Sequence, residues 1–182
     1  PRARRGLGAR TERPLGKGRP VAGSPLRIAA WMGGDRDGNP NVTASVTREV
    51  LCLARWMAAD LYLRDIESLM ADLSMQAASD ELMQYLGVST ESSYEPYRVI
   101  LRQLRERLRA TRVRMEGLLN GTLNDKDASA QEWISCREDL SEPLLLIDRS
   151  LRECGMGTIA DGGLRDTLRR LGCFGVSLLS SG

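Results

Sequence analysis

The sequence contains no histidine among its 182 residues. Histidine is the usual general base, the usual partner of a nucleophilic serine or cysteine, and a common metal ligand. The chain therefore excludes Ser-His and Cys-His catalysis, metal binding by imidazole and a histidine proton shuttle within its own residues. Aromatic residues make up only 4% of the chain, so we expect a core of leucine, methionine, valine and alanine.

Long apolar runs are also missing, since no stretch approaches the ~20 residues that a membrane span needs. A hydrophobic content of 42% and a charged content of 27% are typical of soluble globular proteins. A chain of this length can bury one core, so one domain is expected. We therefore expect a cytoplasmic protein without a membrane partner.

The four cysteines show neither a C-x-x-C pair nor the spacing of a zinc site. Each lies in an apolar stretch, which favours buried reduced thiols over disulfides. Reduced thiols fit the reducing cytosol. The positions are Cys52, Cys136, Cys154 and Cys173.

The net charge of +2 is unevenly distributed along the chain. Residues 1–20 carry seven basic residues and one glutamate, which leaves 19 basic and 23 acidic residues for the rest. Residues 1–23 have no hydrophobic period and are predicted to be disordered.

Three interpretations of this leader were compared. A nucleic-acid tail would be expected to contain aromatic residues, and a transit peptide would be amphipathic and serine-rich. We favour a non-native leader, such as an out-of-frame stretch, followed by a body at residues 24–182. No nucleic-acid partner is expected.

In the body, helical periodicity predominates, with an apolar strand-like run at each end. Residues 26–32 predict a short buried strand. Thr43 is a suitable N-cap for a helix of nearly 30 residues. The apolar residues at helical spacing along it are Val46, Val50, Leu53, Met57 and Leu61, and the pattern continues through Ile66, Leu69 and Leu73.

The next helices are marked by their ends. Ser79 and Gly87 bound a short helix, and Pro96 suits the first turn of another that ends at Asn120 and Gly121. Residues predicted to line one side of this helix are Tyr97, Leu101, Leu104, Leu108, Thr111 and Met115.

The last third of the chain is predicted to contain helices at 132–137 and 141–154, the second stopped by Gly155. A final helix closes at Gly172, and a strand-like run begins at Cys173. A G-x-G-x-x-A pattern begins at Gly155, but a dinucleotide site needs a preceding strand rather than a helix.

The turn at residues 33–40 concentrates three glycines, a proline and four charged or amide side chains. Its spacing does not fit an EF-hand, which requires a glycine at position six and a glutamate at position twelve. Two interpretations stay open. The side chains hold a tight bend through Asx-turns, or the acids orient arginines of an anion site. The residues are Asp35, Arg36, Asp37 and Asn39.

This turn and several later blocks resemble phosphoenolpyruvate carboxylase. The similar segments follow one another in the family's order over roughly residues 24–178. They are residues 31–43, 47–48, 53–55, 60–62, 72–75, 95–101, 154–157, 166–170 and 173–176.

The resemblance implies an enzyme that carboxylates phosphoenolpyruvate with bicarbonate to give oxaloacetate and phosphate, assisted by Mg²⁺ or Mn²⁺. It implies a helix-rich α/β (TIM-like) barrel, usually a cytoplasmic homotetramer. This chain would be an internal fragment, mainly α, with one barrel strand at each end of a helical block. The turn at 33–40 would lie beside the active site in a supporting role.

The resemblance also implies what the chain lacks. The family's essential histidine lies upstream, and its metal-binding acids, lysine and arginine loop lie downstream. The sequence departs from the family after Val176, before a substrate-binding arginine would follow. We therefore expect no catalytic residue, no metal ligand and no activity in the isolated chain.

Five arginines share one helical face, which usually indicates a solvated or salt-bridged flank. Plant-type members of the family hold a sugar-phosphate activator with arginines, and Arg98 resembles one of them. The five residues are Arg98, Arg102, Arg105, Arg109 and Arg112.

Two other functional classes remain as alternatives. One is a non-enzymatic helical interaction module that uses this arginine-rich helix against an acidic partner. The other is a transferase in which Asp35 and Asp37 bind Mn²⁺ with a nucleotide.

Overall fold

The computed structural model describes residues 44–87, 95–124 and 132–177. Across these three ranges the chain is mainly helical and has no strand. The mainly α part of the predicted fold class is confirmed. The leader, the predicted strand at 26–32 and the turn at 33–40 lie outside the described residues, so these features and the barrel stay predictions.

The longest helix, α1 (Ala44–Asp72), has 29 residues, as its periodicity predicts. The predicted apolar pattern faces the core only in its last part. Ile66, Leu69 and Leu73 are buried, whereas Leu53 and Leu61 of the same predicted pattern are 50% and 49% exposed. Helical spacing shows which residues share a face, but when both sides are apolar it does not show which one packs inward.

Helix α2 (Asp80–Leu86) has the two ends predicted for it. The Ser79 hydroxyl accepts a hydrogen bond from the Leu82 N–H at 3.4 Å. Gly87 adopts a left-handed conformation with φ of 67° and closes the helix. Both ends are local features, because the cap residue and the glycine act on the adjacent turn.

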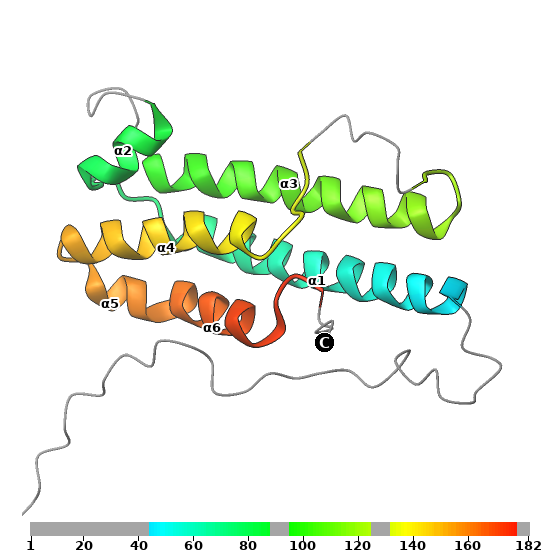
Figure 1. Ribbon diagram of the computed structural model, residues 1–182. Coiled ribbons are helices and arrows are strands. Elements are labelled where there is room, and N and C mark those ends of the chain that lie inside the picture. Colours follow the sequence, from blue (N-terminus) through cyan, green and yellow to red (C-terminus); the bar gives the residue numbers. More distant parts are fainter. Residues whose placement is uncertain (1–43, 88–94, 125–131, 178–182) are drawn as a thin grey trace, which may run out of the picture.

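Helix α3 (Pro96–Leu119) runs antiparallel beside α1, and the two make the most extensive contact among the described helices (Figure 1). Its first residue is Pro96, as predicted, and it ends before Asn120 and Gly121, whose φ is 69°. The predicted inner side is confirmed. All six of its residues are buried: Tyr97, Leu101, Leu104, Leu108, Thr111 and Met115.

Helix α4 (Glu138–Glu153) ends before Gly155, as predicted, but the segment at 132–137 is not helical. Side chains from elsewhere bond its backbone. The Ile134 N–H donates to the Thr111 hydroxyl at 2.9 Å, and the Ser135 N–H donates to the Asp139 carboxylate at 2.7 Å. Such side-chain partners compete with helical hydrogen bonds, so the prediction of a helix here is wrong.

The chain then turns back along α4 through three consecutive helical pieces, and α6 packs against α4 (Figure 1). Gly162 lies in the middle piece with non-helical torsion angles and kinks it. The pieces are α5 (Gly157–Ile159), the π-helical turn η1 (Ala160–Leu164) and α6 (Arg165–Phe174).

The predicted end of the last helix at Gly172 is wrong, and so is the strand predicted to begin at Cys173. Helix α6 continues to Phe174 and ends at Gly175, which has a φ of 61°. A glycine in the positive-φ region is the usual helix stop, and Gly175 is the one that adopts it. Residues 175–177 form a turn.

The core lies between α1, α3, α4 and α6, and apart from two tyrosines its buried hydrophobic side chains are aliphatic. A few polar side chains, among them Thr111 and Ser150, are buried as well. The aliphatic composition matches the prediction from the low aromatic content. All four cysteines are free, but Cys136 is exposed and the other three are only partly buried. The prediction of buried thiols is therefore wrong. None of the described helices is both long and apolar enough to span a membrane.

Candidate functional site

The four side chains predicted to support an active site, Asp35, Arg36, Asp37 and Asn39, lie outside the described residues. Their supporting role stays a prediction. Arg98 is the predicted site residue that the structure describes.

Arg98 lies in the first turn of α3 and reaches the last turn of α1. Its Nε donates to the Met70 carbonyl and its Nη1 to the Glu95 carboxylate, both at 2.6 Å. The last four carbonyls of a helix have no partner within that helix, and its C-terminus attracts positive charge. Arg98 therefore caps α1 while it begins α3.

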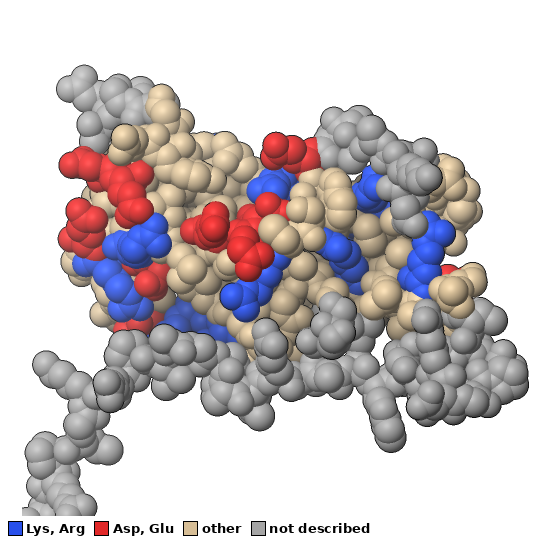
Figure 2. Space-filling view, in the orientation of Figure 1, with Lys and Arg blue, Asp and Glu red and all other residues tan. Residues whose placement is uncertain are grey.

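The rest of the arginine face is salt-bridged, as its spacing predicts. Arg109 contacts Glu67 at 3.4 Å and Arg112 contacts Asp60 at 2.9 Å, so both join α3 to α1. Basic and acidic side chains alternate across the face shown in Figure 2. The arginines thus form a neutralised seam between helices. The remaining pairs are Arg102 with Glu95 and Arg105 with Glu106.

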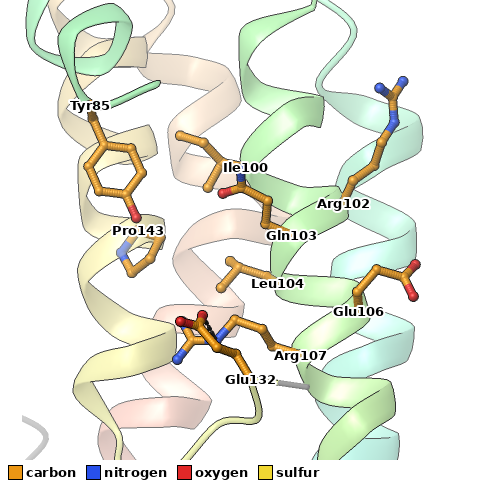
Figure 3. A pocket seen from close by; sticks show the side chains of 9 residues that line it. All are labelled: Tyr85, Ile100, Arg102, Gln103, Leu104, Glu106, Arg107, Glu132 and Pro143. Carbon is orange, nitrogen blue, oxygen red and sulfur yellow. Dashed lines mark ion pairs between the residues drawn. The ribbon is translucent and has the colours of Figure 1, made fainter. Parts of the chain in front are cut away.

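A groove of about 620 Å³ opens between α2, α3 and the start of α4 (Figure 3). The apolar part of its lining is Ile100, Leu104 and Pro143, and the Tyr85 ring points toward Pro143. A second hollow of about 550 Å³ continues along α2 and α4 and shares the Tyr85, Arg107 and Pro143 lining. Such a shape can hold an extended group with polar contacts at its edges.

Arg107 is the central cation of this groove. Its Nη2 lies 3.1 Å from the Asp139 carboxylate, and its Nε lies 3.7 Å from that of Glu132. Burial of the Asp139 carboxyl opposes its ionisation. Hydrogen bonds from Cys136, Ser135 and Arg107 outweigh that effect and hold the pKa of Asp139 well below its usual value. Arg107 thus faces two acids and is already neutralised.

No pattern in the sequence indicates this groove. Arg107 does not lie on the arginine face of α3, and Tyr85 comes from another helix. The one sequence feature that points to the groove is Arg107, an arginine outside the periodic face. Single arginines on a helix are too common to indicate a binding site. The groove arises from the packing of three helices.

The non-helical segment at 132–137 is held by a second arginine cluster. The guanidinium groups of Arg55 and Arg114 lie 4.8 and 5.0 Å from the centre of the Trp133 ring. Arg55 also donates to the carbonyl of Ile134 at 2.8 Å and to that of Ser135. These contacts fix the path of the chain into α4, which forms one wall of the groove.

Within the described ranges, no three histidine, cysteine or acidic side chains come together in a way that could hold a metal ion. These residues therefore do not fit a Mg²⁺ or Mn²⁺ site. What the described helices do contain is a groove and an arginine that caps α1.

A family model described as phosphoenolpyruvate carboxylase matches residues 1–180. The matched range includes residues 1–23. That this leader is non-native stays a prediction. The chain is 58% identical over 156 residues to "Phosphoenolpyruvate carboxylase" of Alcanivorax borkumensis, which covers 86% of this chain and 17% of the relative.

Two further curated relatives carry the same name. The protein of Pseudomonas aeruginosa is 56% identical over 167 residues, covering 92% of this chain and 18% of the relative. The protein of Marinobacter nauticus is 53% identical over 179 residues, covering 98% of this chain and 19% of the relative. The chain therefore spans less than a fifth of the length of these curated relatives.

Proposed function

This chain belongs to the phosphoenolpyruvate carboxylase family, and we propose that the polypeptide of family length that carries it converts phosphoenolpyruvate and bicarbonate to oxaloacetate and phosphate. The observation that carries this proposal is the family match over residues 1–180, supported by identities of 53–58% to relatives of that name. The identity extends over most of this chain, which supports placing it as one segment of such a polypeptide.

The chemistry requires groups that different segments of the polypeptide must supply. Phosphoryl transfer to bicarbonate requires positive charge around the phosphate and a divalent ion, Mg²⁺ or Mn²⁺ in this proposal. The described residues offer no carboxylate cluster for such an ion, and the chain has no histidine to act as a base. We propose that this segment supplies the helical scaffold and the turn at 33–40 next to an active site completed by the rest of the polypeptide.

We also propose that Arg98 binds an anionic effector, such as a sugar phosphate, in the assembled enzyme. Its side chain is 27% exposed, and two nitrogens of its guanidinium already donate to Met70 and Glu95. An effector phosphate would have to share the guanidinium with Glu95 or replace it. A cytoplasmic homotetramer is part of the same proposal.

The interaction-module alternative is weakened by the ion pairs of the arginine face. An acidic partner would have to displace acids that those arginines already bind. Surface pairs are individually weak, but replacing them brings no net gain in charge pairing.

The proposed function is tested with two proteins. One is the 182-residue chain, and the other is the Pseudomonas aeruginosa relative with this segment in place of its matched region. Oxaloacetate is measured by coupling it to NADH oxidation through malate dehydrogenase. We expect activity from the chimaera with phosphoenolpyruvate, bicarbonate and Mg²⁺, and none from the chain alone. A folded chimaera without activity would contradict the proposal.

A further inference from the structure

Helix α1 has a second apolar side that nothing in the described structure covers. Five of its large hydrophobic side chains are 40–50% exposed, and all but Leu51 lie on this side, together with the partly exposed Val50. Successive positions are three or four residues apart, so they form one line along the helix, which we call the α1 stripe. The stripe consists of Val46, Val50, Leu53, Met57 and Leu61.

The α1 stripe lies almost opposite the side that enters the core. At 100° per residue, its mean direction is roughly 160° from that of the buried residues. Those include Ala58, Tyr62 and Ile66, which are at most 3% exposed. A helix that is apolar on both sides is typical of the interior of a larger structure. The sequence of α1 is therefore suited to burial on two sides.

The α1 stripe is uncharged along its whole length. It spans 16 residues, or about 22 Å of helix, and Arg64, whose side chain is 73% exposed and paired with Asp60, follows it one turn later. The stripe itself offers a charged partner nothing to pair with, and the nearest exposed charges, Glu49 and Arg64, lie at its border. The matching surface must itself be aliphatic.

The stripe could be covered by a second molecule or by another part of the same polypeptide. The area of the stripe and the covalent link to the covering segment favour the second case. A stripe about 22 Å long on a helix about 10 Å wide presents roughly 200 Å². Stable dimers bury about 800 Å² on each partner. A second copy docked on the stripe alone would therefore bind weakly. A tethered segment does not lose the freedom that two separate molecules lose on association.

A lipid surface fits the stripe poorly. Helices that lie in a membrane interface expose a charged face opposite the apolar one. In α1 the opposite face is buried in the core against α3.

We propose that the α1 stripe is an internal docking surface, covered by an aliphatic surface from the part of a family-length polypeptide that lies outside these 182 residues. The share of the relatives that this chain spans, 17–19%, leaves most of such a polypeptide available to provide it. This proposal rests on family membership and geometry, and it does not depend on catalytic activity.

The test is methionine oxidation followed by mass spectrometry, which needs no substitution. Met57 lies in the α1 stripe and is 47% exposed, whereas Met83 on α2 is 5% exposed and reports whether the protein is folded. Rates are measured with hydrogen peroxide in the isolated chain and in the Pseudomonas aeruginosa chimaera, each relative to the urea-unfolded protein. We expect Met57 to be oxidised at least tenfold more slowly in the chimaera than in the isolated chain.

Three results would overturn the proposal. Equal Met57 rates in both proteins would mean that the stripe stays open. Protection of Met57 in the isolated chain at all concentrations would place the cover within these 182 residues. Protection that grows with chain concentration, together with a dimer in light scattering, would identify a second copy. Rapid oxidation of Met83 in the chimaera would mean that the chimaera is not folded. The measurement is then made with the Alcanivorax borkumensis relative as the host protein.

A matched pair of substitutions gives a second measure. Leu53→Glu places a charge in the α1 stripe, and Val113→Glu places one on α3 at a side chain that is 64% exposed. In the isolated chain both should shift the thermal midpoint by little and by similar amounts. In the chimaera Leu53→Glu should lower it clearly, and an unchanged midpoint would contradict internal docking.

Discussion

The hydroxyl oxygens of Tyr97 and Ser150 lie 3.0 Å apart in the core, where α3 meets α4. The Ser79 N–H donates to the same Ser150 oxygen at 2.8 Å and brings in the start of α2. Tyr97 and Ser150 are fully buried, and Ser79 is 4% exposed. One serine oxygen thus connects three helices in a place that water does not reach.

Ser150→Ala should cost more stability than Tyr97→Phe. The alanine leaves both the Tyr97 hydroxyl and the Ser79 N–H buried without this partner, and each such group costs about 1–3 kcal/mol. The phenylalanine removes its own hydroxyl and leaves the serine still bonded to Ser79, a loss of about 0.5–1.5 kcal/mol. Urea unfolding measures both free energies. Ser68→Ala, on an exposed position of α1, is the control, and equal losses for the two core variants would disprove the shared role of Ser150.

Tyr62 should make the stability of the chain sensitive to alkaline pH. Its hydroxyl donates to the Gly175 carbonyl at 2.7 Å. Burial, with a smaller contribution from Asp65, raises the pKa of Tyr62 well above its usual value. A pKa that is higher in the folded state gives stability that is complete below the unfolded value of about 10 and is lost as the pH rises above it.

The measurement is the free energy of unfolding at several pH values on either side of pH ~10, the ordinary tyrosine pKa. Tyr62→Phe should lose about 1 kcal/mol at neutral pH from the missing hydrogen bond. Above pH ~10, the free energy of unfolding of Tyr62→Phe should fall less steeply with pH than that of the wild type. Tyr85→Phe, at a side chain that is 56% exposed, is the matched control. Parallel curves for wild type and Tyr62→Phe would contradict the assignment.

Asp139 should have the opposite pH dependence. Its carboxylate accepts from the N–H groups of Ser135 and Cys136 at 2.7 and 3.0 Å, so Asp139→Ala should cost about 1 kcal/mol, as the loss of a helix cap does. Because its pKa is lowered in the folded state, this stabilisation is present above the ordinary value of about 4 and is lost as the pH falls below it. The difference between wild type and variant should narrow in acid. A difference that is independent of pH would show that the carboxylate charge is not involved.

Features that depend on neighbouring residues could be predicted from the sequence. The caps at Ser79, Gly87 and Pro96 and the stop at Gly155 act on the adjacent turn, and all four were correct. The family resemblance similarly came from a contiguous block of unusual composition.

Features that depend on tertiary contacts could not be predicted from the sequence. The segment at 132–137 has a helical pattern, but Thr111 and Arg55, more than 20 residues away in sequence, bond its backbone instead. The inward side of α1 was predicted correctly at Ile66 and Leu69 but not in the turns before them, because both sides of that part of the helix are apolar. The groove around Arg107 required the packing of α2 and α4 on α3.

Arg98 and Arg102 share one face of α3 and both lie near Glu95, yet their substitutions should differ. Arg98 makes two bonds of 2.6 Å, one of them to the end of α1, and its side chain is 27% exposed. Arg102 lies 3.8 Å from Glu95 and is 53% exposed. Hydrogen bonds to charged groups contribute about 1.5–3 kcal/mol, whereas exposed ion pairs contribute roughly 0–1 kcal/mol.

Arg98→Ala should therefore destabilise the chain by about 1–3 kcal/mol in urea unfolding, and Arg102→Ala by less than about 1 kcal/mol. Arg98→Lys should recover only part of the loss, because a lysine does not present the planar fork that reaches two acceptors. In the enzymatically active chimaera, Arg98→Ala should also abolish activation by a sugar phosphate while Arg102→Ala retains it. Full activation in the Arg98→Ala chimaera would limit Arg98 to its capping role at the end of α1.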